Sequence, residues 1–455
     1  MGAVRRCAIP LLLAAALCAL PASAAAAGSE RPREPFFPRA GNVGYDALAY
    51  SAQIAFDARS GRIKASAQIE ALASQRLSNF SLDLRGLTVT AVEVNGQRAR
   101  FNRGRDKLKI HPQTPVPPGS GFKVSVHYEG RPQTVIDADG GHEGWIPTDD
   151  GAFAVGEPQG TMVWLPCNNV PADKASFQIA LTVPSNLKAV SNGRLLEISR
   201  GGGRTTYTWR EPGPMSTYLA LIDIGRGKLL DGKVAGRPSW TLIDPRQEKR
   251  TLPVLAELGE VIRFEEKIFG PYPFEAVGSV VDFEPKLGYA LETQSRTIYA
   301  FIPDLTTVVH ETAHQWFGDS VGLQRWPNIW LNEGFATWAQ WYYAERHGGR
   351  SARDIFRALY RVPASHEELW EPPSGHPGTP KNLFSSSVYV RGAMALEALR
   401  IKVGTKPMLR VLKRWASDHA YASANIKQFV ADAEKVTGKN LDPLFQRWLY
   451  KRGKP

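Results

Sequence analysis

Two histidines four residues apart are the residues of this 455-residue chain whose types and spacing most directly suggest chemistry. They stand in His310-Glu311-Thr312-Ala313-His314, directly after the apolar Val308 and Val309. Side chains four positions apart share one face of a helix, so both imidazoles can bind one metal ion while Glu311 projects beside them. A catalytic metal site of this kind needs a third protein ligand and a position left open to water.

A glutamate follows at a distance that suits the third ligand. Glu333 lies in the apolar segment 330–336, with eighteen residues between it and His314. That separation allows a short excursion and the antiparallel return of a second helix. The sequence therefore predicts one zinc ion per chain, held by His310, His314 and Glu333, with water in the fourth position. The competing interpretation, two ordinary histidines on a helix surface, leaves Glu333 without a role.

The elements that must position these residues change in kind along the chain. From about residue 44 apolar and polar residues alternate, as in Ile63 to Ile69, and Asn95-Gly96 predicts a tight hairpin. After about residue 245 apolar residues recur at helical spacing, first over residues 252–269. Further helices are predicted at residues 310–317, 332–347, 392–403, 407–419, 425–437 and 443–450, and a long loop at residues 363–381.

These patterns predict an α+β protein. We expect a β-rich, antiparallel N-terminal domain at residues 44–245 and a mainly helical catalytic domain at residues 246–455. Residues 25–43 contain three prolines with little periodicity, which predicts an extended tether.

The first 24 residues have the pattern of a cleavable signal peptide. Arg5 and Arg6 precede an apolar run, and small residues follow up to Ala24. The run is shorter than the roughly 20 residues that cross a bilayer. We therefore expect a secreted or periplasmic protein without stable membrane insertion.

Composition excludes several classes of protein. With 43% hydrophobic residues and 10% aromatic residues, the chain is not intrinsically disordered. Two of its 3 cysteines lie in the signal peptide, so Cys167 alone forms neither an intrachain disulfide nor a cysteine zinc site. The net charge of +12 is spread without a long Lys/Arg run, which predicts a mixed surface and no nucleic-acid partner.

The metal-binding stretch HETAHQWFGDSVGLQRWPNIWLNEGFATW resembles the zinc core of the aminopeptidase N family, the gluzincins of peptidase family M1 that include leukotriene hydrolase. The eighteen-residue spacing is similar to that family rather than to thermolysin-type endopeptidases, whose glutamate lies one residue further. The resemblance implies a saddle-like β domain on a thermolysin-like, mainly helical catalytic domain. Only five residues follow Tyr450, so we expect a short form whose cleft lacks a helical roof.

Three further segments resemble motifs of the same family. Residues 288–293, Gly-Tyr-Ala-Leu-Glu-Thr, are similar to its exopeptidase motif, which implies that Glu292 binds the free α-ammonium group of the substrate. Residues 156–160 resemble another segment of that family, which implies that Glu157 is a second contact to the α-ammonium group. Residues 388–393 resemble the segment whose tyrosine, here Tyr389, stabilises the oxyanion.

The resemblance implies a zinc-dependent aminopeptidase that acts on peptides with a free N-terminus, and the signal-peptide pattern predicts that it is secreted. Glu311 is expected to take a proton from water and to deliver it to the leaving amine. The alternatives are a zinc endopeptidase or epoxide hydrolase on the same fold, or a catalytically silent binding protein. Neither the preferred N-terminal residue nor an oligomeric state is predicted by these residues.

Overall fold

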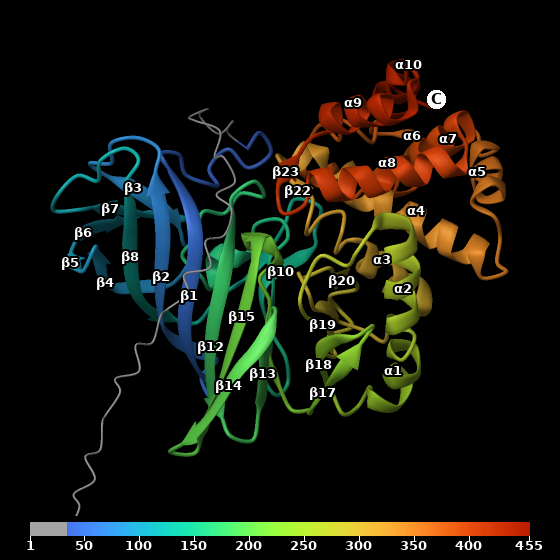
Figure 1. Ribbon diagram of the computed structural model, residues 1–455. Coiled ribbons are helices and arrows are strands. Elements are labelled where there is room, and N and C mark those ends of the chain that lie inside the picture. Colours follow the sequence, from blue (N-terminus) through green and yellow to red (C-terminus); the bar gives the residue numbers. More distant parts are fainter. Residues whose placement is uncertain (1–33) are drawn as a thin grey trace, which may run out of the picture. The chain divides into compact units, whose positions relative to one another are not determined.

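The alternation of apolar residues in the N-terminal half builds a large sheet. The computed structural model describes residues 34–455 (Figure 1), so the predicted signal peptide lies outside the described residues. In β2 (Arg62–Ala73) Ile63, Ala65, Ala67 and Ile69 are buried, whereas Lys64 is exposed. The strand order of this eight-stranded sheet is β14 (Arg194–Gly201), β15 (Arg204–Ser216), β12 (Lys174–Pro184), β1 (Tyr45–Asp57), β2, β8 (Gly121–Gly130), β4 (Thr88–Val94) and β5 (Gln97–Arg98).

Most pairings in the N-terminal half are antiparallel, and the predicted hairpin at Asn95-Gly96 joins β4 to β5. One pairing differs, because β1 and β12 are parallel. A five-stranded sheet has the order β13 (Lys188–Ser191), β16 (Ile222–Gly225), β11 (Ala152–Val155), β10 (His142–Pro147) and β9 (Thr134–Ile136). A three-stranded sheet has the order β3 (Phe80–Asp83), β7 (Lys107–His111) and β6 (Arg100–Arg103).

Residues 34–43, the described part of the predicted tether, form bends and turns against the rest of the protein. Glu34 is buried, and its carboxylate accepts hydrogen bonds from the backbone N–H groups of Phe36 and Trp326, each at 3.0 Å. The ring of Phe37 meets that of Trp326 edge to face. This segment is therefore fixed by polar and aromatic contacts that its proline content did not indicate.

A further five-stranded sheet contains strands from before and from after residue 245, where we predicted the domain limit. Its order is β17 (Lys228–Val234), β18 (Arg237–Ile243), β19 (Val277–Val281), β21 (Thr297–Tyr299) and β20 (Ala290–Leu291), and β18 pairs with β19 in parallel. The last strand of the N-terminal half, β18, thus pairs with a strand that follows the first two helices. A short parallel pair, β22 (Gly322–Leu323) and β23 (Ser423–Ala424), lies nearer the C-terminus.

Helices dominate after residue 245, as predicted, although their limits shift. The segment expected to be one helix at residues 252–269 is two, and Pro253, which has no backbone N–H, lies near the end of the first. The helices are α1 (Glu248–Leu255), α2 (Leu258–Phe269), α3 (Leu305–Ala313), α4 (Trp330–Arg346), α5 (Ala352–Tyr360), α6 (Glu367–Trp370), α7 (Gly392–Val403), α8 (Thr405–Asp418), α9 (Ile426–Thr437) and α10 (Asp442–Phe445), with π-helical turns at Ser387–Arg391 and Gln446–Tyr450.

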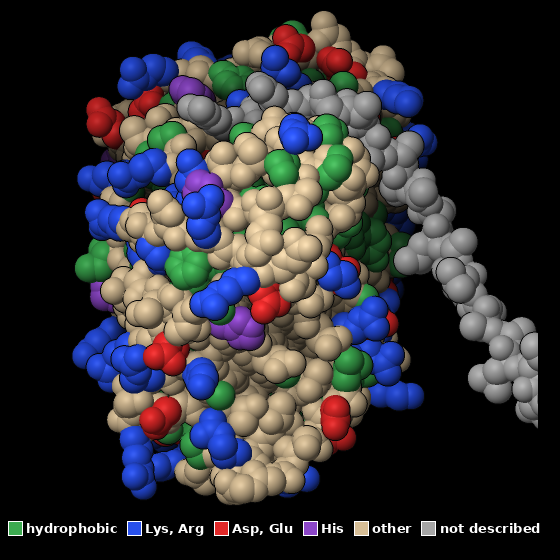
Figure 2. Space-filling view, turned by 90° about the vertical axis from the view of Figure 1, so that its left-hand side faces the viewer, with side chains coloured by type: hydrophobic (Ala, Val, Ile, Leu, Met, Phe, Trp, Pro, Cys, Tyr) green, Lys and Arg blue, Asp and Glu red, His purple; other side chains and the backbone are tan. Residues whose placement is uncertain are grey.

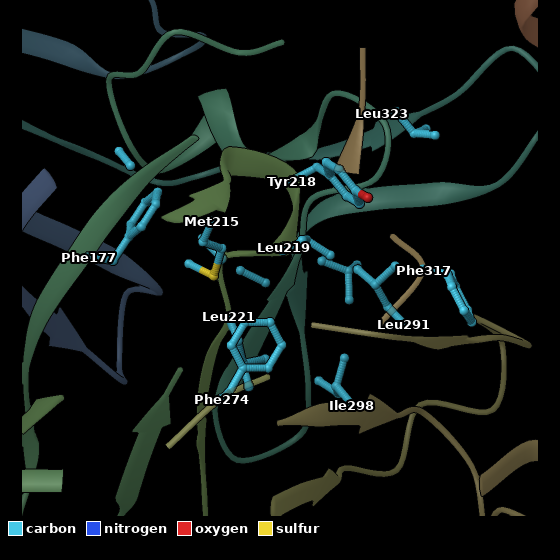
Figure 3. Close-up of a cluster of buried hydrophobic side chains, with 14 of the residues drawn as sticks. Phe177, Met215, Tyr218, Leu219, Leu221, Phe274, Leu291, Ile298, Phe317 and Leu323 are labelled. Atoms are coloured by element: carbon cyan, nitrogen blue, oxygen red, sulfur yellow. The ribbon is translucent and has the colours of Figure 1, made fainter. Parts of the chain in front are cut away.

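Apolar packing joins the β-rich half to the helical half. Figure 3 draws Leu219 and Leu221 of the β-rich half in one buried cluster with Leu291 and Ile298 of the helical half, and all four are at most 2% exposed. Both halves contribute to one hydrophobic core. Because protein interiors are packed as tightly as organic crystals, the side chains of the two halves are held in a fixed relation.

The surface carries charges of both signs. On the face shown in Figure 2, Lys and Arg side chains are spread out, with Asp and Glu side chains between them. None of the helices in residues 34–455 combines the length and the apolar composition that a bilayer crossing requires.

Candidate metal centre and active-site cleft

Helix α3 carries the first predicted ligand and the candidate base. It begins after Asp304, whose carboxylate accepts a hydrogen bond from the backbone N–H of Thr307 at 2.7 Å, a typical N-cap. Sequence patterning predicted a helix at residues 310–317, but the helix starts five residues earlier and ends at Ala313. His314 follows with helical backbone angles, so it shares a face with His310.

The three predicted ligands converge. Nε2 of His310 and Nε2 of His314 lie 3.3 and 3.4 Å from the same oxygen, Oε2 of Glu333. One potential ligand atom from each residue lies within 4.8 Å of the others, and all three side chains are buried. Two imidazoles and one carboxylate form a donor set that zinc prefers. These residues fit one zinc ion per chain.

The orientation of His314 is set by the loop that follows it. Its Nδ1 lies 3.0 Å from the carbonyl oxygen of Phe317. A carbonyl only accepts hydrogen bonds, so Nδ1 carries the proton and Nε2 presents its lone pair to the ligand position. Gly318 has φ +134°, and a Cβ there would lie 3.2 Å from Nδ2 of Asn332. A glycine lets the loop pass this close to α4.

A close approach of two helices positions Glu333 relative to Tyr389. A Cβ on Gly334 of α4 would lie 3.1 Å from the carbonyl carbon of Gly392, and one on Gly392 would lie 3.2 Å from Cα of Gly334. Glycine at both positions therefore lets α4 and the start of α7 touch through their backbones. Glu333 directly precedes one glycine, and Tyr389 lies three residues before the other.

The guanidinium group of Arg391 fixes the π-helical turn that carries Tyr389. This fully buried group donates hydrogen bonds to the carbonyl oxygens of Trp448 at 2.8 Å and Gly453 at 3.0 Å, and also to those of Trp370 and Lys451. The C-terminal segment is thus attached to the residue two positions after Tyr389.

All seven site residues predicted from the sequence line one cavity of about 320 Å³. Besides the three ligands these are Glu311, Tyr389, Glu292 and Glu157. Carboxylate oxygens of Glu292 and Glu311 and a nitrogen of His314 lie within 4.8 Å of one another, as do carboxylate oxygens of Glu157, Glu292 and Glu333. The structure therefore brings together residues that are up to 232 positions apart in the chain, from Glu157 to Tyr389.

Burial and neighbouring charges set the protonation of the site groups. Burial alone would raise the pKa of Glu333, but the charges and hydrogen bonds of His314 and His310 lower it to about 2. Burial raises the pKa of Glu311 to about 8, against the opposing effect of His314. Burial and the nearby carboxylates, Glu333 first, raise the pKa of Tyr389 well above its ordinary value. Tyr389 is therefore a neutral hydrogen-bond donor.

Glu292 and Glu157 have the environment of a cation site. Oε1 of each carboxylate is buried and has no hydrogen-bond partner among the described residues. Buried carboxylate oxygens without partners carry a large desolvation cost. An ammonium group between them would supply the missing donors.

Sequence reasoning missed Gln315, the residue that holds Glu292 in place. Its Nε2 donates to the backbone carbonyl of Glu292 at 3.0 Å, and its Oε1 accepts from the N–H of Ser295 at 2.7 Å. The residue directly follows the ligand His314, and that adjacency was the available signal. The amide thus ties the strand end that carries Glu292 to the metal helix.

Comparisons with known proteins agree with this arrangement. The Peptidase family M1 domain matches residues 303–448, and the Peptidase M1 N-terminal domain matches residues 46–219. Aminopeptidase M1 of Arabidopsis thaliana is 28% identical over 66% of this chain, and leucyl aminopeptidase of Saccharolobus solfataricus is 25% identical over 82%. These matches cover 36% and 50% of the two relatives, so the chain spans half or less of their length.

Solved structures match over nearly the whole described chain. The M1 zinc metallopeptidase from Deinococcus radiodurans has a TM-score of 0.84 and 27% identity, with 93% of this chain and 97% of that chain covered. A mutant of that metallopeptidase bound to a Tyr-Ser-Ala substrate has a TM-score of 0.85 and 27% identity, with 93% and 98% covered. With both its N-terminal and its catalytic domain matched, the chain belongs to peptidase family M1.

Proposed function

We propose that the protein is a secreted zinc-dependent aminopeptidase that removes N-terminal residues from peptides. The observation that carries this proposal is the position of Glu157 and Glu292. Their carboxylate oxygens lie within 4.8 Å of the ligand Glu333, and each has a buried oxygen without a partner. A cation site beside the metal ligands fixes a free α-ammonium group one residue away from the reacting carbonyl.

The remaining side chains supply the steps of peptide hydrolysis. A zinc ion held by His310, His314 and Glu333 supplies Lewis acidity for the scissile carbonyl and for a water molecule. Glu311 takes a proton from the attacking water on a carboxylate oxygen and then delivers it to the leaving amine. Tyr389 donates its hydroxyl hydrogen to the oxyanion that develops on the former carbonyl oxygen.

Binding the amine also favours cleavage after a single residue. When the α-ammonium group occupies the site between Glu157 and Glu292, the first peptide carbonyl is the one that reaches Glu311 and Tyr389. A blocked N-terminus has no positive charge to offer these carboxylates and leaves them unpaired. Neither an endopeptidase nor an epoxide hydrolase needs such a pair.

A set of matched substrates tests the proposal. Leucyl amide of a fluorogenic amine is compared with its N-acetylated form, each with and without a metal chelator. We expect hydrolysis of the free substrate only, and its loss with the chelator. Equal hydrolysis of the acetylated substrate would identify an endopeptidase, and no hydrolysis of any amide would favour a binding protein.

Export is a separate part of the proposal, supported by Arg5, Arg6 and the apolar run before Ala24. Expression of the full chain in a secreting host, followed by N-terminal sequencing of the exported protein, tests it. The expected mature N-terminus follows Ala24. Retention of Met1 on all of the protein would contradict export by cleavage.

A further inference from the structure

The cavity that holds the metal ligands contains three carboxylates that the proposed reaction does not use. One acidic residue is a metal ligand, one is the base and two bind the α-ammonium group. Asp137, Asp139 and Glu143 remain, and no Lys or Arg is found among the described residues that line the cavity. We call these three residues the acidic end of the cavity.

Glu143 is the most enclosed of the three. It lies on β10 opposite Val135 of β9 and is 2% exposed. Its Oε2 accepts a hydrogen bond from the backbone N–H of Gln159 at 2.8 Å, whereas its Oε1 is buried without a partner. Burial raises the pKa of this carboxyl to about 8. A buried carboxylate oxygen that lines a cavity and lacks a donor suits a ligand that brings one.

The other two carboxylates lie on the turn between β9 and β10. Asp137 is half-buried, and its Oδ2 also lacks a hydrogen-bond partner. Asp139 is exposed and accepts from the N–H of Gly141 at 2.8 Å. Neither of them, nor Glu143, forms an ion pair within residues 34–455; the nearby Arg85 is paired with Asp106 at 2.6 Å. No cationic side chain of the described residues is therefore ion-paired with the acidic end.

Apolar side chains line the same cavity as the acidic end and the amine site. The cavity lining includes Pro158, Tyr289 and Phe384. The hydroxyl of Tyr289 donates to the backbone carbonyl of His142 at 2.6 Å, which fastens the loop before Glu292 to β10. A cavity lined by both apolar side chains and unpaired carboxyl groups suits a side chain with an aliphatic stem and a cationic tip.

We propose that the acidic end binds the cationic side chain of the substrate's N-terminal residue, so that the enzyme favours peptides that begin with arginine or lysine. This inference rests on the proposed aminopeptidase function, because the side chain reaches the acidic end only when the α-ammonium group occupies the site of Glu157 and Glu292. Glu143 is the principal specificity-determining residue, since it is the deepest. Asp137 supports it, and Asp139 attracts the cation at the rim.

Substrate pairs of nearly equal shape isolate the charge. Arginyl and citrullyl amides differ mainly in the charge of the side-chain tip, as do lysyl and norleucyl amides. An ion pair with a carboxylate, which only the cationic substrate makes, gives a kcat/KM ratio of roughly 10 to 100 in its favour. A ratio near one for both pairs overturns the inference.

Substitutions test which carboxyl group produces the preference for a cationic side chain. Glu143→Gln keeps the side-chain shape and the acceptor for the Gln159 N–H, and Asp137→Asn is equally conservative. We expect the arginyl-to-citrullyl ratio to fall about tenfold or more in Glu143→Gln and to fall less in Asp137→Asn. The exposed Glu197 on β14 does not line the cavity, so Glu197→Gln makes the same charge change and should keep the wild-type ratio. Equal ratios in all variants would contradict the assignment.

A binding measurement separates this inference from the proposed function. Calorimetry with the Glu311→Gln variant compares argininamide with citrullinamide, and we expect about tenfold tighter binding of argininamide. If neutral aminoacyl amides are hydrolysed but the two affinities are equal, the specificity inference fails while the aminopeptidase function stands. If no amide is hydrolysed, the affinity ratio still decides whether the acidic end binds a cation.

Discussion

The ring of Tyr389 lies nearly parallel to the imidazole of His310, with ring centroids 5.9 Å apart and an interplanar angle of 12°. This packing places the phenol ring of Tyr389 beside one of the predicted zinc ligands. The two residues come from different elements, a π-helical turn and α3, so their relation depends on the contact of α7 with α4 at Gly334 and Gly392.

Tyr389→Phe keeps the ring against His310 and removes only the hydroxyl group. We expect kcat to fall roughly 10² to 10³-fold, as for the loss of one oxyanion donor, with little change in KM. Steady-state kinetics with a fluorogenic aminoacyl amide measures both. Tyr207→Phe in β15 removes the hydroxyl of a residue that does not line the cavity and serves as control. Retention of more than half of the wild-type kcat in Tyr389→Phe would refute the assigned role.

Glu311→Gln removes the proposed base without changing the shape of the side chain. Turnover should fall roughly 10² to 10⁴-fold, because glutamine does not accept the proton of water. Zinc content, measured by elemental analysis, should stay near one ion per chain. If turnover survives in this variant, the proton transfer assigned to Glu311 is wrong.

Glu333→Ala removes the carboxylate oxygen that both ligand histidines approach. We expect the zinc content to fall well below one ion per chain, with activity lost in proportion. Glu345→Ala is a suitable control, because this residue also lies on α4 but pairs with Arg400 away from the cavity. Wild-type zinc content in Glu333→Ala would remove this residue from the ligand set.

Glu292→Gln weakens the charge that the amine site offers. The preference for free over N-acetylated substrates should fall roughly tenfold, mainly through a higher KM, because an ion pair with the ammonium group is replaced by a hydrogen bond to an uncharged amide oxygen. The ratio of kcat/KM for the two substrate forms measures this. An unchanged ratio would show that the ammonium group binds elsewhere.

A buried carboxyl pair predicts a pH dependence of stability. Asp223 on β16 and Asp282 after β19 are at most 5% exposed, and burial raises the pKa of Asp282 to about 6. A raised folded-state pKa means that the folded state binds the proton more tightly. Stability is therefore lost as pH rises from the unfolded value, about 3.9, to about 6.

Asp282→Asn should remove the part of this loss that Asp282 contributes, and it keeps the acceptor for the N–H of Phe283. Burial also raises the pKa of Asp223, which keeps its own part of the loss. Between pH 4 and 7 the free energy of unfolding of the variant should gain up to about 3 kcal/mol on the wild type. Denaturant titrations at several pH values measure the difference. Asp231→Asn changes an exposed carboxylate and should run parallel to the wild type. If the free energy of unfolding of Asp282→Asn has the same pH dependence as that of the wild type, the contribution assigned to Asp282 is wrong.

Local patterns account for what the sequence predicted well. The spacing of His310 and His314 needs only one helical turn, and the return that brings Glu333 back is short. The family resemblance placed Glu292, Glu157 and Tyr389, and the structure brings all three to the same cavity. The early start of α3 follows from the cap at Asp304, a signal that lies outside the apolar pattern used to place the helix.

Contacts between distant segments account for what was missed. Gln315 acts through the backbone of Glu292, and nothing in the pattern around Gln315 identifies that partner. The pairing of β18 with β19 joins strands on either side of two helices, so the composition change near residue 245 did not reveal it. The acidic end depends on a turn and a strand that lie far from the metal motif in the chain.

The four carbonyl groups that accept from Arg391 give the C-terminal segment an influence on catalysis. Three of them, on Trp448, Lys451 and Gly453, lie in the last eight residues of the chain. A purification tag fused to Pro455 or a trimmed C-terminus would disturb these acceptors, and with them the turn that aims Tyr389. Turnover measured on a tagged or trimmed protein would therefore reflect the altered C-terminus as well as the chemistry of the cleft.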